Sequence, residues 1–305
     1  MSRLIAKVDG GLGKNIMFTS LLKRLKEKYT NEIHLSTSYP PVFMNNSLVT
    51  SLNEFHKIDF KSIKEDPETF LCFEDPYSSK SFIKKEKHLL EIWSDLLGLD
   101  DSQKGMDCKP ELFFSEQDKK EFEILYNTIR LEINDSPFIL IQLTGGQSPI
   151  SYDQGGSSNT FNYSKEDLQR AYPMHLVVKL VKELRKAFPK HVLMRYGLPN
   201  EVLPFDIKYD MYNPPAMGYK YFSSLSKRAY KVITIDSSLQ HLAAAAEAPS
   251  YVIWGETSPE HFGYNIHTNI TEKQEETCSY WHAIGEYNNN VIFPSPEKIL
   301  DIIKS

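Results

Sequence analysis

The sequence predicts an α/β protein built from two domains, each with a parallel β-sheet. Short apolar runs alternate with segments of helical periodicity along most of the chain, as buried strands alternate with covering helices. The same order, an apolar run, a glycine cluster and then a helix, begins at residue 4 and again at residue 138. A chain of 305 residues is also long for one core and comfortable for two domains.

The first half opens as a strand, a turn and a helix. Residues 4–8 are apolar, and Gly10, Gly11 and Gly13 follow them as a tight turn. Apolar residues then recur at helical spacing and predict one buried helix face: Phe18, Leu21, Leu22, Leu25 and Tyr29. Residues 32–37 are the next predicted strand, so this segment begins a parallel sheet.

The remainder of the first half is less regular. The best strand candidate covers residues 70–73, and helical periodicity predicts a helix over 82–97. Another helix follows Ser115, which forms a capping box with Asp118. The polar segment 132–137 ends in proline, so we expect an amino-terminal domain over residues 1–135 and a carboxyl-terminal domain over 136–293.

The second half repeats the pattern after its first strand, residues 138–143. A polar loop over 147–162 precedes a helix start at Ser164 and Asp167. Helical periodicity predicts helices over residues 176–188, 221–229 and 239–247, and apolar runs predict strands over 191–196, 232–235 and, as the last, 250–254. Ser295 and Pro296 fit the N-cap and first position of a closing helix within residues 294–305.

Composition excludes several classes of protein. The formal net charge of −5 does not favour nucleic acid or an anionic membrane as a partner. The three cysteines form no CxxC pair or Cys/His cluster, so neither a zinc site nor a disulfide framework is indicated. There is no signal-peptide pattern and no apolar stretch long enough to span a bilayer. We therefore expect a cytoplasmic protein without a zinc site.

The first candidate site is the run from Asp9 to Asn15, between the first strand and its helix. Glycines there let the backbone approach a ligand closely, and the helix start offers unpaired N–H groups. The spacing fits neither GxGxxG nor a P-loop, which argues against a dehydrogenase. By itself the run is equally well explained as a tight connection.

The second candidate site follows the strand 232–235. Asp236, Ser237, Ser238 and His241 cluster at the carboxyl end of a predicted parallel strand, where open α/β sheets bind ligands. Taken singly, the first three are explained as helix-capping residues and His241 as a buried imidazole. The combined string favours a site.

This string carries a family resemblance. Residues 236–244, DSSLQHLAA, and residues 255–259, GETSP, resemble the donor-binding signature of glycosyltransferase family 9, the heptosyltransferase-like enzymes. The run Gly11-Leu12-Gly13 is similar to the family's amino-terminal loop. The resemblance implies a GT-B fold, in which two Rossmann-like domains with parallel sheets face each other across a cleft. It also implies an inverting, metal-independent transfer of a sugar from a nucleoside-diphosphate sugar, which is a substrate, so we expect no bound metal or cofactor.

The resemblance further implies roles for single residues. Asp236, Ser237, Ser238 and His241 match positions that hold the sugar and diphosphate of the donor, and Gly11 and Gly13 line the facing loop. Thr144 and Gly145 match a phosphate-contacting position, and Arg170 matches a basic residue that neutralises the diphosphate. Met217 matches a residue packed on the nucleotide base, and Glu201 an acid that binds the ribose.

One departure concerns the catalytic base. The family usually has Asp after Gly-x-Gly, whereas this chain has Lys14, which at its ordinary pKa cannot accept a proton. Asp9 is the nearest carboxylate able to reach the same place, so we predict that Asp9 is the general base. A turn carboxylate is the competing explanation. Lys14 is then expected to contact a phosphate of donor or acceptor.

The leading hypothesis is a heptosyltransferase-like enzyme acting on lipopolysaccharide core or a related glycan or lipid-linked saccharide. A phage-type DNA glycosyltransferase acting on a hydroxymethylated base is the first alternative, and lysine-rich runs at 23–28 and 84–87 suit a phosphorylated acceptor, although solvated helix faces explain them more simply. A catalytically inactive nucleotide-sugar-binding protein is the second alternative, because Lys14 replaces the usual base.

Overall fold

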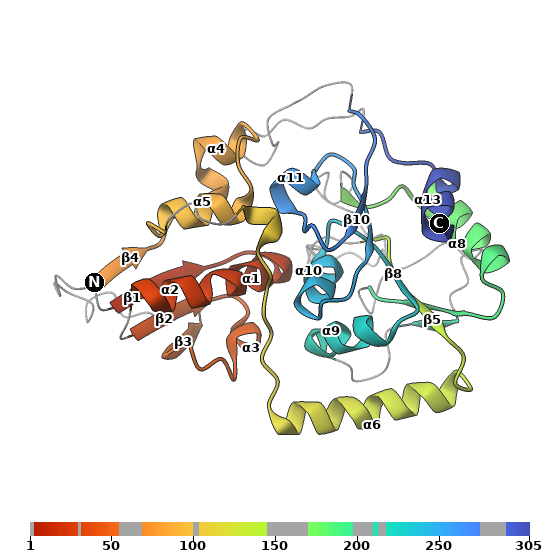
Figure 1. The fold of residues 1–305 in the computed structure, drawn as a ribbon, viewed down its shortest axis with the longest axis horizontal. Coiled ribbons are helices and arrows are strands. Elements are labelled where there is room, and N and C mark those ends of the chain that lie inside the picture. The colour runs from red at the N-terminus through yellow and green to blue at the C-terminus, as the bar shows by residue number, and fades with distance from the viewer. Residues whose placement is uncertain are drawn as a thin grey trace, which may run out of the picture.

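The computed structural model describes residues 3–29, 32–54, 69–99, 104–144, 170–197, 210–212, 218–274 and 291–305. These residues form two parallel sheets that lie side by side, with helices α1 and α10 between them (Figure 1). The predicted α/β class and the division into two sheets are therefore confirmed. The predicted domain boundary after residue 135 stays a prediction.

The first sheet has the order β3-β2-β1-β4, and every neighbouring pair in it is parallel. Its strands are β1 (Arg3–Val8), β2 (Glu32–Thr37), β3 (Ser51–Glu54) and β4 (Thr69–Cys72). Helix α1 (Leu12–Phe18), the 3-10 turn η1 (Thr19–Leu21) and α2 (Leu22–Lys28) form a continuous helical segment after β1. The five apolar residues predicted for its inner face are all at most 1% exposed, which confirms the periodicity.

Two details of the first half differ from the sequence prediction. The helix expected over residues 82–97 is interrupted: α4 (Lys80–Ile83) ends in a turn where Lys85 has φ 58°, and α5 (Leu89–Leu96) starts anew with His88 as its N-cap. Apolar spacing continues across the break, so periodicity alone could not locate it. Strand β3 was not predicted, because its short sequence SLNE lacks an apolar run.

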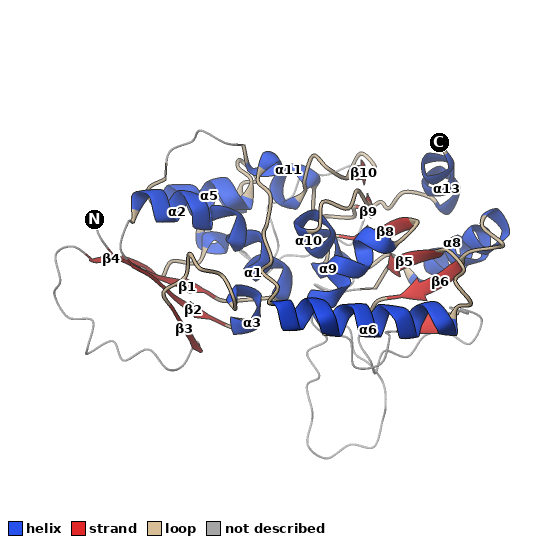
Figure 2. Ribbon diagram, turned by 60° about the horizontal axis from the view of Figure 1, so that its bottom comes forward, coloured by secondary structure: helices blue, strands red, loops and turns tan. Residues whose placement is uncertain are grey.

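The rest of the first half is short helical elements and one long helix. The short ones are α3 (Pro40–Phe43) and the 3-10 turns η2 (Pro76–Ser78) and η3 (Gly105–Asp107). Helix α6 (Glu116–Glu132) begins with the predicted Ser115–Asp118 capping box, in which both reciprocal hydrogen bonds are present. In both views α6 runs along α9 of the second half (Figures 1 and 2), and Tyr221 donates a hydrogen bond to Glu121 across this contact.

The second sheet has the order β7-β6-β5-β8-β9-β10. Its strands are β5 (Phe138–Gln142), β6 (Val192–Arg195), β7 (Met211–Tyr212), β8 (Lys231–Ile235), β9 (Tyr251–Ile253) and β10 (Thr268–Ile270). The helices are α8 (Met174–Ala187), α9 (Tyr219–Arg228), α10 (Ser238–Ala245), α11 (Pro259–Phe262) and α13 (Pro296–Lys304). In chain order the strands read 3-2-1-4-5-6, which is the doubly wound dinucleotide-binding order.

The elements predicted for the second half are confirmed in part. The predicted strand over 250–254 exists as β9 but is not the last strand, because the short β10 follows it. The closing helix is confirmed, with the Ser295 side chain accepting a hydrogen bond from Lys298 N and Pro296 in the first turn. The helix start predicted at Ser164 and Asp167 lies outside the described residues.

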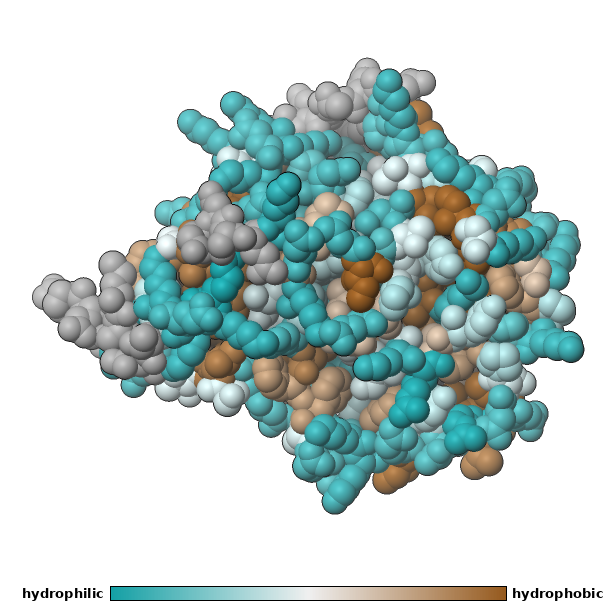
Figure 3. All heavy atoms as spheres, viewed as in Figure 1, coloured by the Kyte–Doolittle hydropathy of each residue, from teal (hydrophilic) through white to brown (hydrophobic). Residues whose placement is uncertain are grey.

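Within the described ranges, none of the helices combines the length and apolar character that crossing a bilayer requires. Figure 3 shows a mostly hydrophilic face with separate apolar patches. Cys72 and Cys108 are buried free thiols.

Candidate functional site

The first sheet places two carboxylates side by side at one point. Strand order reverses between β1 and β4, which are neighbours in space but not in sequence. Asp9 directly follows β1, and Asp75 lies three residues beyond β4. In open parallel sheets, ligands bind outside the carboxyl ends of the strands at such a reversal. Asp9 therefore lies where the sequence predicts it, and Asp75 is a second acid at the same place.

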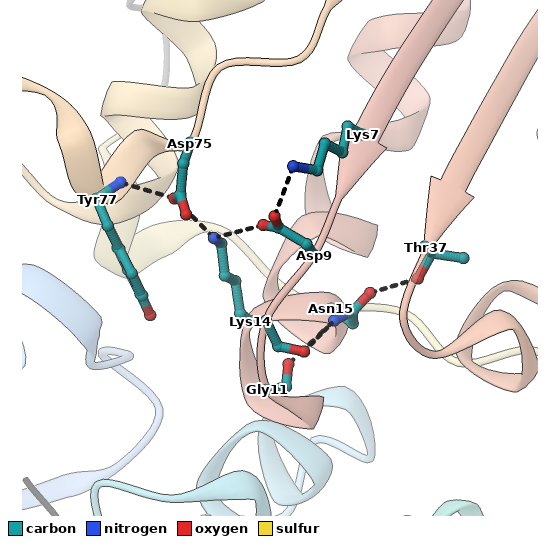
Figure 4. Close-up of polar contacts among 9 residues, drawn as sticks. Lys7, Asp9, Gly11, Lys14, Asn15, Thr37, Asp75 and Tyr77 are labelled. Carbon is teal, nitrogen blue, oxygen red and sulfur yellow. Dashed lines mark hydrogen bonds and ion pairs between the residues drawn. The ribbon is translucent and has the colours of Figure 1, made fainter. Parts of the chain in front are cut away.

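Lys14 joins these two carboxylates (Figure 4). Its Nζ donates to Asp75 Oδ1 at 2.7 Å and to Asp9 Oδ1 at 3.3 Å, and it lies 4.4 Å from the centre of the Tyr77 ring. The residue is 6% exposed. A buried ammonium is stable only with such partners. Lys14 is thus held by two acids of this protein.

Asp9 also contacts a second lysine. Lys7 Nζ lies 2.9 Å from Asp9 Oδ2 (Figure 4). Burial by itself would raise the pKa of Asp9, but hydrogen bonds and charges from Lys7 and Lys14 outweigh it and hold the pKa below its ordinary value. Asp9 is consequently ionised at neutral pH.

The glycine turn between these residues is fixed by a short polar chain. Gly10 has φ +90°, a conformation that favours glycine. Asn15 Nδ2 donates to Gly11 O at 3.0 Å, and Thr37 Oγ1 donates to Asn15 Oδ1 at 2.5 Å (Figure 4). Asn15 and Thr37 are both buried. These bonds tie the turn after β1 to the end of β2 and so fix the position of Lys14.

The second sheet has its own reversal point between β5 and β8. Gln142 pairs with Thr234, so continuing this register sets Thr144 level with Asp236. Thr144 is 5% and Asp236 6% exposed. Gln240 Nε2 donates to Asp236 Oδ1 at 2.6 Å. Two residues predicted to bind the donor therefore flank the point where this sheet topology binds nucleotides.

The start of α10 is capped by a residue that sequence analysis missed. Ser237 is the N-cap, but its side chain makes no capping hydrogen bond, contrary to the capping role considered from sequence. Instead Gln142 Oε1 accepts from Leu239 N at 3.0 Å, and Gln142 Nε2 donates to Ser237 Oγ at 3.0 Å. Ser238 Oγ lies 3.4 Å from Tyr196 Oη.

Arg170 acts electrostatically on residues of both halves. Its charge lowers the pKa of four groups from both halves of the chain: Tyr77, Asp236, His241 and Glu256. Burial is the larger influence in each case, and it raises the pKa of Asp236 overall despite this cation. Arg170 is thus near enough to the Asp236 motif and to Tyr77 of the first half for its charge to act on both.

His241 packs directly against the first half. Its Nδ1 lies 2.8 Å from Tyr264 Oη, and its ring covers Gly13 so closely that a Cβ there would lie 2.5 Å from His241 Cδ2. The residue is 4% exposed. Burial, with smaller contributions from His267, His88 and Arg170, lowers its pKa to about 3, so the ring is neutral. Gly13 is therefore the residue that lets α1 and α10 meet.

Two more histidines hold the halves together. His88 Nε2 donates to Gly263 O at 3.1 Å, and His261 Nε2 donates to Lys85 O at 2.7 Å. A carbonyl only accepts, so both Nε2 atoms carry the proton. His88 also accepts at Nδ1 from Leu90 N, which makes it neutral, and burial lowers its pKa to about 4. The orientation of the two sheets thus depends on buried neutral imidazoles.

The remaining candidate residues include some that the sequence predicted and some that it did not. Gly145, Glu201 and Met217 lie outside the described residues, so their roles stay predictions. Asp75 was missed, although its place just after the predicted strand 70–73 obeys the same rule that selected Asp9. Glu256 was quoted within the GETSP motif but not singled out. Across the described ranges, no group of three or more His, Cys, Asp or Glu residues is arranged to hold a metal ion.

Comparison with known sequences supports the resemblance. The sequence model of glycosyltransferase family 9 (heptosyltransferase) matches residues 215–285, which include the Asp236–His241 string and the GETSP turn. No curated protein matches the chain. The resemblance to this family is confirmed over the matched segment.

Solved structures match the whole chain. A family 9 glycosyltransferase from Veillonella parvula has a TM-score of 0.70 at 12% identity, covering 99% of this chain and 96% of its own. ADP-heptose lipopolysaccharide heptosyltransferase II from E. coli has a TM-score of 0.60 at 13% identity, covering 100% and 98%. TibC, described as a dodecameric iron-containing heptosyltransferase in complex with ADP-D-β-D-heptose, has a TM-score of 0.57 at 12% identity, covering 99% and 75%. The predicted GT-B fold is thereby confirmed.

Proposed function

We propose that the protein transfers a sugar from a nucleoside-diphosphate sugar to an acceptor hydroxyl, with inversion at the anomeric carbon. The observation that carries this proposal is the meeting of two reversal points. The charge of Arg170 acts both on Asp236, at the reversal point of the second sheet, and on Tyr77, whose ring lies 4.4 Å from the Lys14 Nζ of the Asp9–Lys14–Asp75 cluster at the reversal point of the first. The family match over residues 215–285 supports it independently.

The proposed donor site has its cationic centre at Arg170. A departing nucleoside diphosphate accumulates negative charge, and a guanidinium stabilises it with paired hydrogen bonds. The first N–H groups of α10 add positive potential, because helix starts attract anions. Thr144, Gly145, Ser237 and Ser238 then contact phosphate or sugar, while Glu201 and Met217 contact the nucleoside. These groups supply the charge stabilisation that a metal supplies in other transferases, and we propose metal-independent transfer.

The proposed reaction is a single displacement. The acceptor oxygen attacks the anomeric carbon and forms the new bond as the bond to the diphosphate oxygen breaks. We keep Asp9 as the proposed base that takes the hydroxyl proton, because it is ionised and 26% exposed in its side chain. Lys14 positions Asp9 and Asp75 through its two ion pairs. Its burial between them argues against a contact with donor phosphate.

The proposed donor is an ADP-heptose-type sugar nucleotide, since the TibC complex with ADP-D-β-D-heptose shares this fold. The proposed acceptor is a hydroxyl of lipopolysaccharide core or a related glycan. The test below distinguishes this proposal from two alternatives: transfer to hydroxymethylated DNA, and binding of a nucleotide sugar without turnover.

The test is a panel of nucleotide sugars, measured first by thermal shift and then by transfer. A true donor raises the melting temperature by mass action. Arg170→Gln is expected to weaken ADP binding about 10- to 100-fold, as loss of charge-assisted hydrogen bonds does. Arg130→Gln, at an exposed position of α6, is the matched control and is expected to bind normally. Binding without transfer to any glycan or DNA acceptor would favour the inactive binding protein.

A further inference from the structure

Glu256 is buried with no partner for its carboxyl group. It lies in the loop between β9 and α11 and is 6% exposed. Within the described part of the chain, neither Oε1 nor Oε2 has a hydrogen-bond partner, and the same holds for Oγ1 of its neighbour Thr257. Burying a carboxyl group without a partner destabilises a fold, so a ligand that supplies the missing donors is the natural explanation.

This carboxyl group belongs to the donor end of the site. Strand β9 pairs with β8 so that Ile253 is level with Ile235. Asp236 therefore follows beside Trp254, and Glu256 lies two residues further along the same edge. Thr257 is near enough to lower the pKa of Asp236, although its hydroxyl does not reach hydrogen-bond geometry. Burial raises the pKa of Glu256 above its ordinary value, and the charges of Lys85 and Arg170 offset this only in part.

The chemistry of these atoms selects one part of a sugar nucleotide. A carboxylate accepts hydrogen bonds and a hydroxyl can accept or donate. A diphosphate offers only acceptor oxygens and negative charge, which Glu256 repels and Arg170 attracts. Sugar hydroxyls offer the donors that Glu256 lacks. Arg170 and Glu256 thus divide the site into an anionic and a polyol portion.

We propose that Glu256, assisted by Thr257, binds hydroxyl groups of the donor's sugar and so distinguishes the sugar nucleotide from the free diphosphate. This inference rests on the proposed function and adds a specificity-determining residue to it.

The experiment compares ADP with ADP-D-β-D-heptose by calorimetry on wild-type protein and Glu256→Gln. We expect the variant to bind ADP as wild type does and ADP-D-β-D-heptose about 10- to 100-fold more weakly. Glu256→Met is expected to raise the melting temperature of the ligand-free protein, because it removes an unpartnered buried carboxyl group. Glu260→Gln, at an exposed position of α11, is the matched control and should leave the affinity for both ligands unchanged.

Each outcome decides the question. If Glu256→Gln bound both ligands equally more weakly, or bound ADP-D-β-D-heptose with unchanged affinity, the inference would be overturned and the proposed function would still stand. Wild-type protein that binds neither ligand would refute both. If Glu256→Gln does not fold, Thr257→Val provides the second variant, and a selective loss of sugar-nucleotide affinity is again expected.

Discussion

Replacing Gly13 by alanine tests how closely the two halves of the molecule approach. The added Cβ would lie 2.5 Å from His241 Cδ2 and 2.8 Å from Nε2, well inside contact distance. The imidazole cannot turn away freely, since its Nδ1 is bonded to the buried Tyr264 hydroxyl at 2.8 Å. Either the ring leaves this hydrogen bond or α1 and α10 separate.

The expected cost follows from these contacts. Overpacking a well-filled interior costs about 1–3 kcal/mol. Alanine in place of glycine within a helix would otherwise be favourable by up to about 1 kcal/mol, so the sign of the effect depends on the clash. For a chain of this length we expect the melting temperature to fall by roughly 2–5 °C.

A double-mutant cycle isolates the contact. Gly13→Ala, His241→Ala and the double variant are unfolded thermally and in urea. Without the imidazole, the alanine at position 13 is expected to be neutral or stabilising, which gives a coupling energy of about 1–3 kcal/mol. Gly218→Ala is the matched control, because a Cβ there meets nothing within 4 Å.

Two results would refute the reasoning. If Gly13→Ala were as harmless as Gly218→Ala, the close approach of α1 and α10 would be incorrect. Strict additivity of Gly13→Ala and His241→Ala would show that the cost of the alanine arises elsewhere than at the imidazole.

Three further predictions concern charge and capping. Stability should fall as the pH drops from about 6.5 to about 4, because the unfolded chain then takes up protons on three histidines that stay neutral in the folded protein. Burial lowers the pKa of His88 to about 4, that of His241 to about 3 and that of His267 to about 4. A melting temperature that is flat over this range would contradict it. Lys14→Met should destabilise by about 1–3 kcal/mol near neutral pH, less than a fully buried pair because Asp9 and Asp75 are partly exposed. Urea unfolding should show a smaller cost only well below about pH 4, because the lowered pKa of Asp9 keeps its carboxylate charged at pH 4. An equal cost at neutral pH and in this acid range would argue against the ion pairs. Ser115→Ala should cost about 1 kcal/mol in urea unfolding by removing the α6 cap, and no change would show that the capping box is dispensable.

Local signals located much of the fold. Short continuous apolar runs located β1, β2, β5 and β8 to within a residue or two, because strands of parallel sheets are buried on both faces. The capping residues Ser115 and Ser295 found two helix starts, since capping depends on a few neighbouring residues. Polar or very short strands such as β3 and β10 carry no such signal. Their place in the sheet comes from pairing with a neighbouring strand.

The candidate site also contains residues that the sequence could select and residues that it could not. Asp9, Asp236 and His241 could be selected from sequence because each lies just after a strand or in a recognisable string. The lysine–carboxylate cluster could not, because Lys14 and Asp75 are far apart in the chain and meet only when β1 and β4 pair. Glu256 is unremarkable in sequence, and only its burial without a partner marks it.

The sequence by itself therefore determined the α/β class, the two parallel sheets and the heptosyltransferase-like string at residues 236–259, because periodicity and motifs are properties of neighbouring residues. Tertiary structure alone decided which charges meet, which polar atoms lack partners and how Gly13 fits under His241. Those facts depend on distances between segments remote in the chain, and burial sets their energies once the sheets have packed.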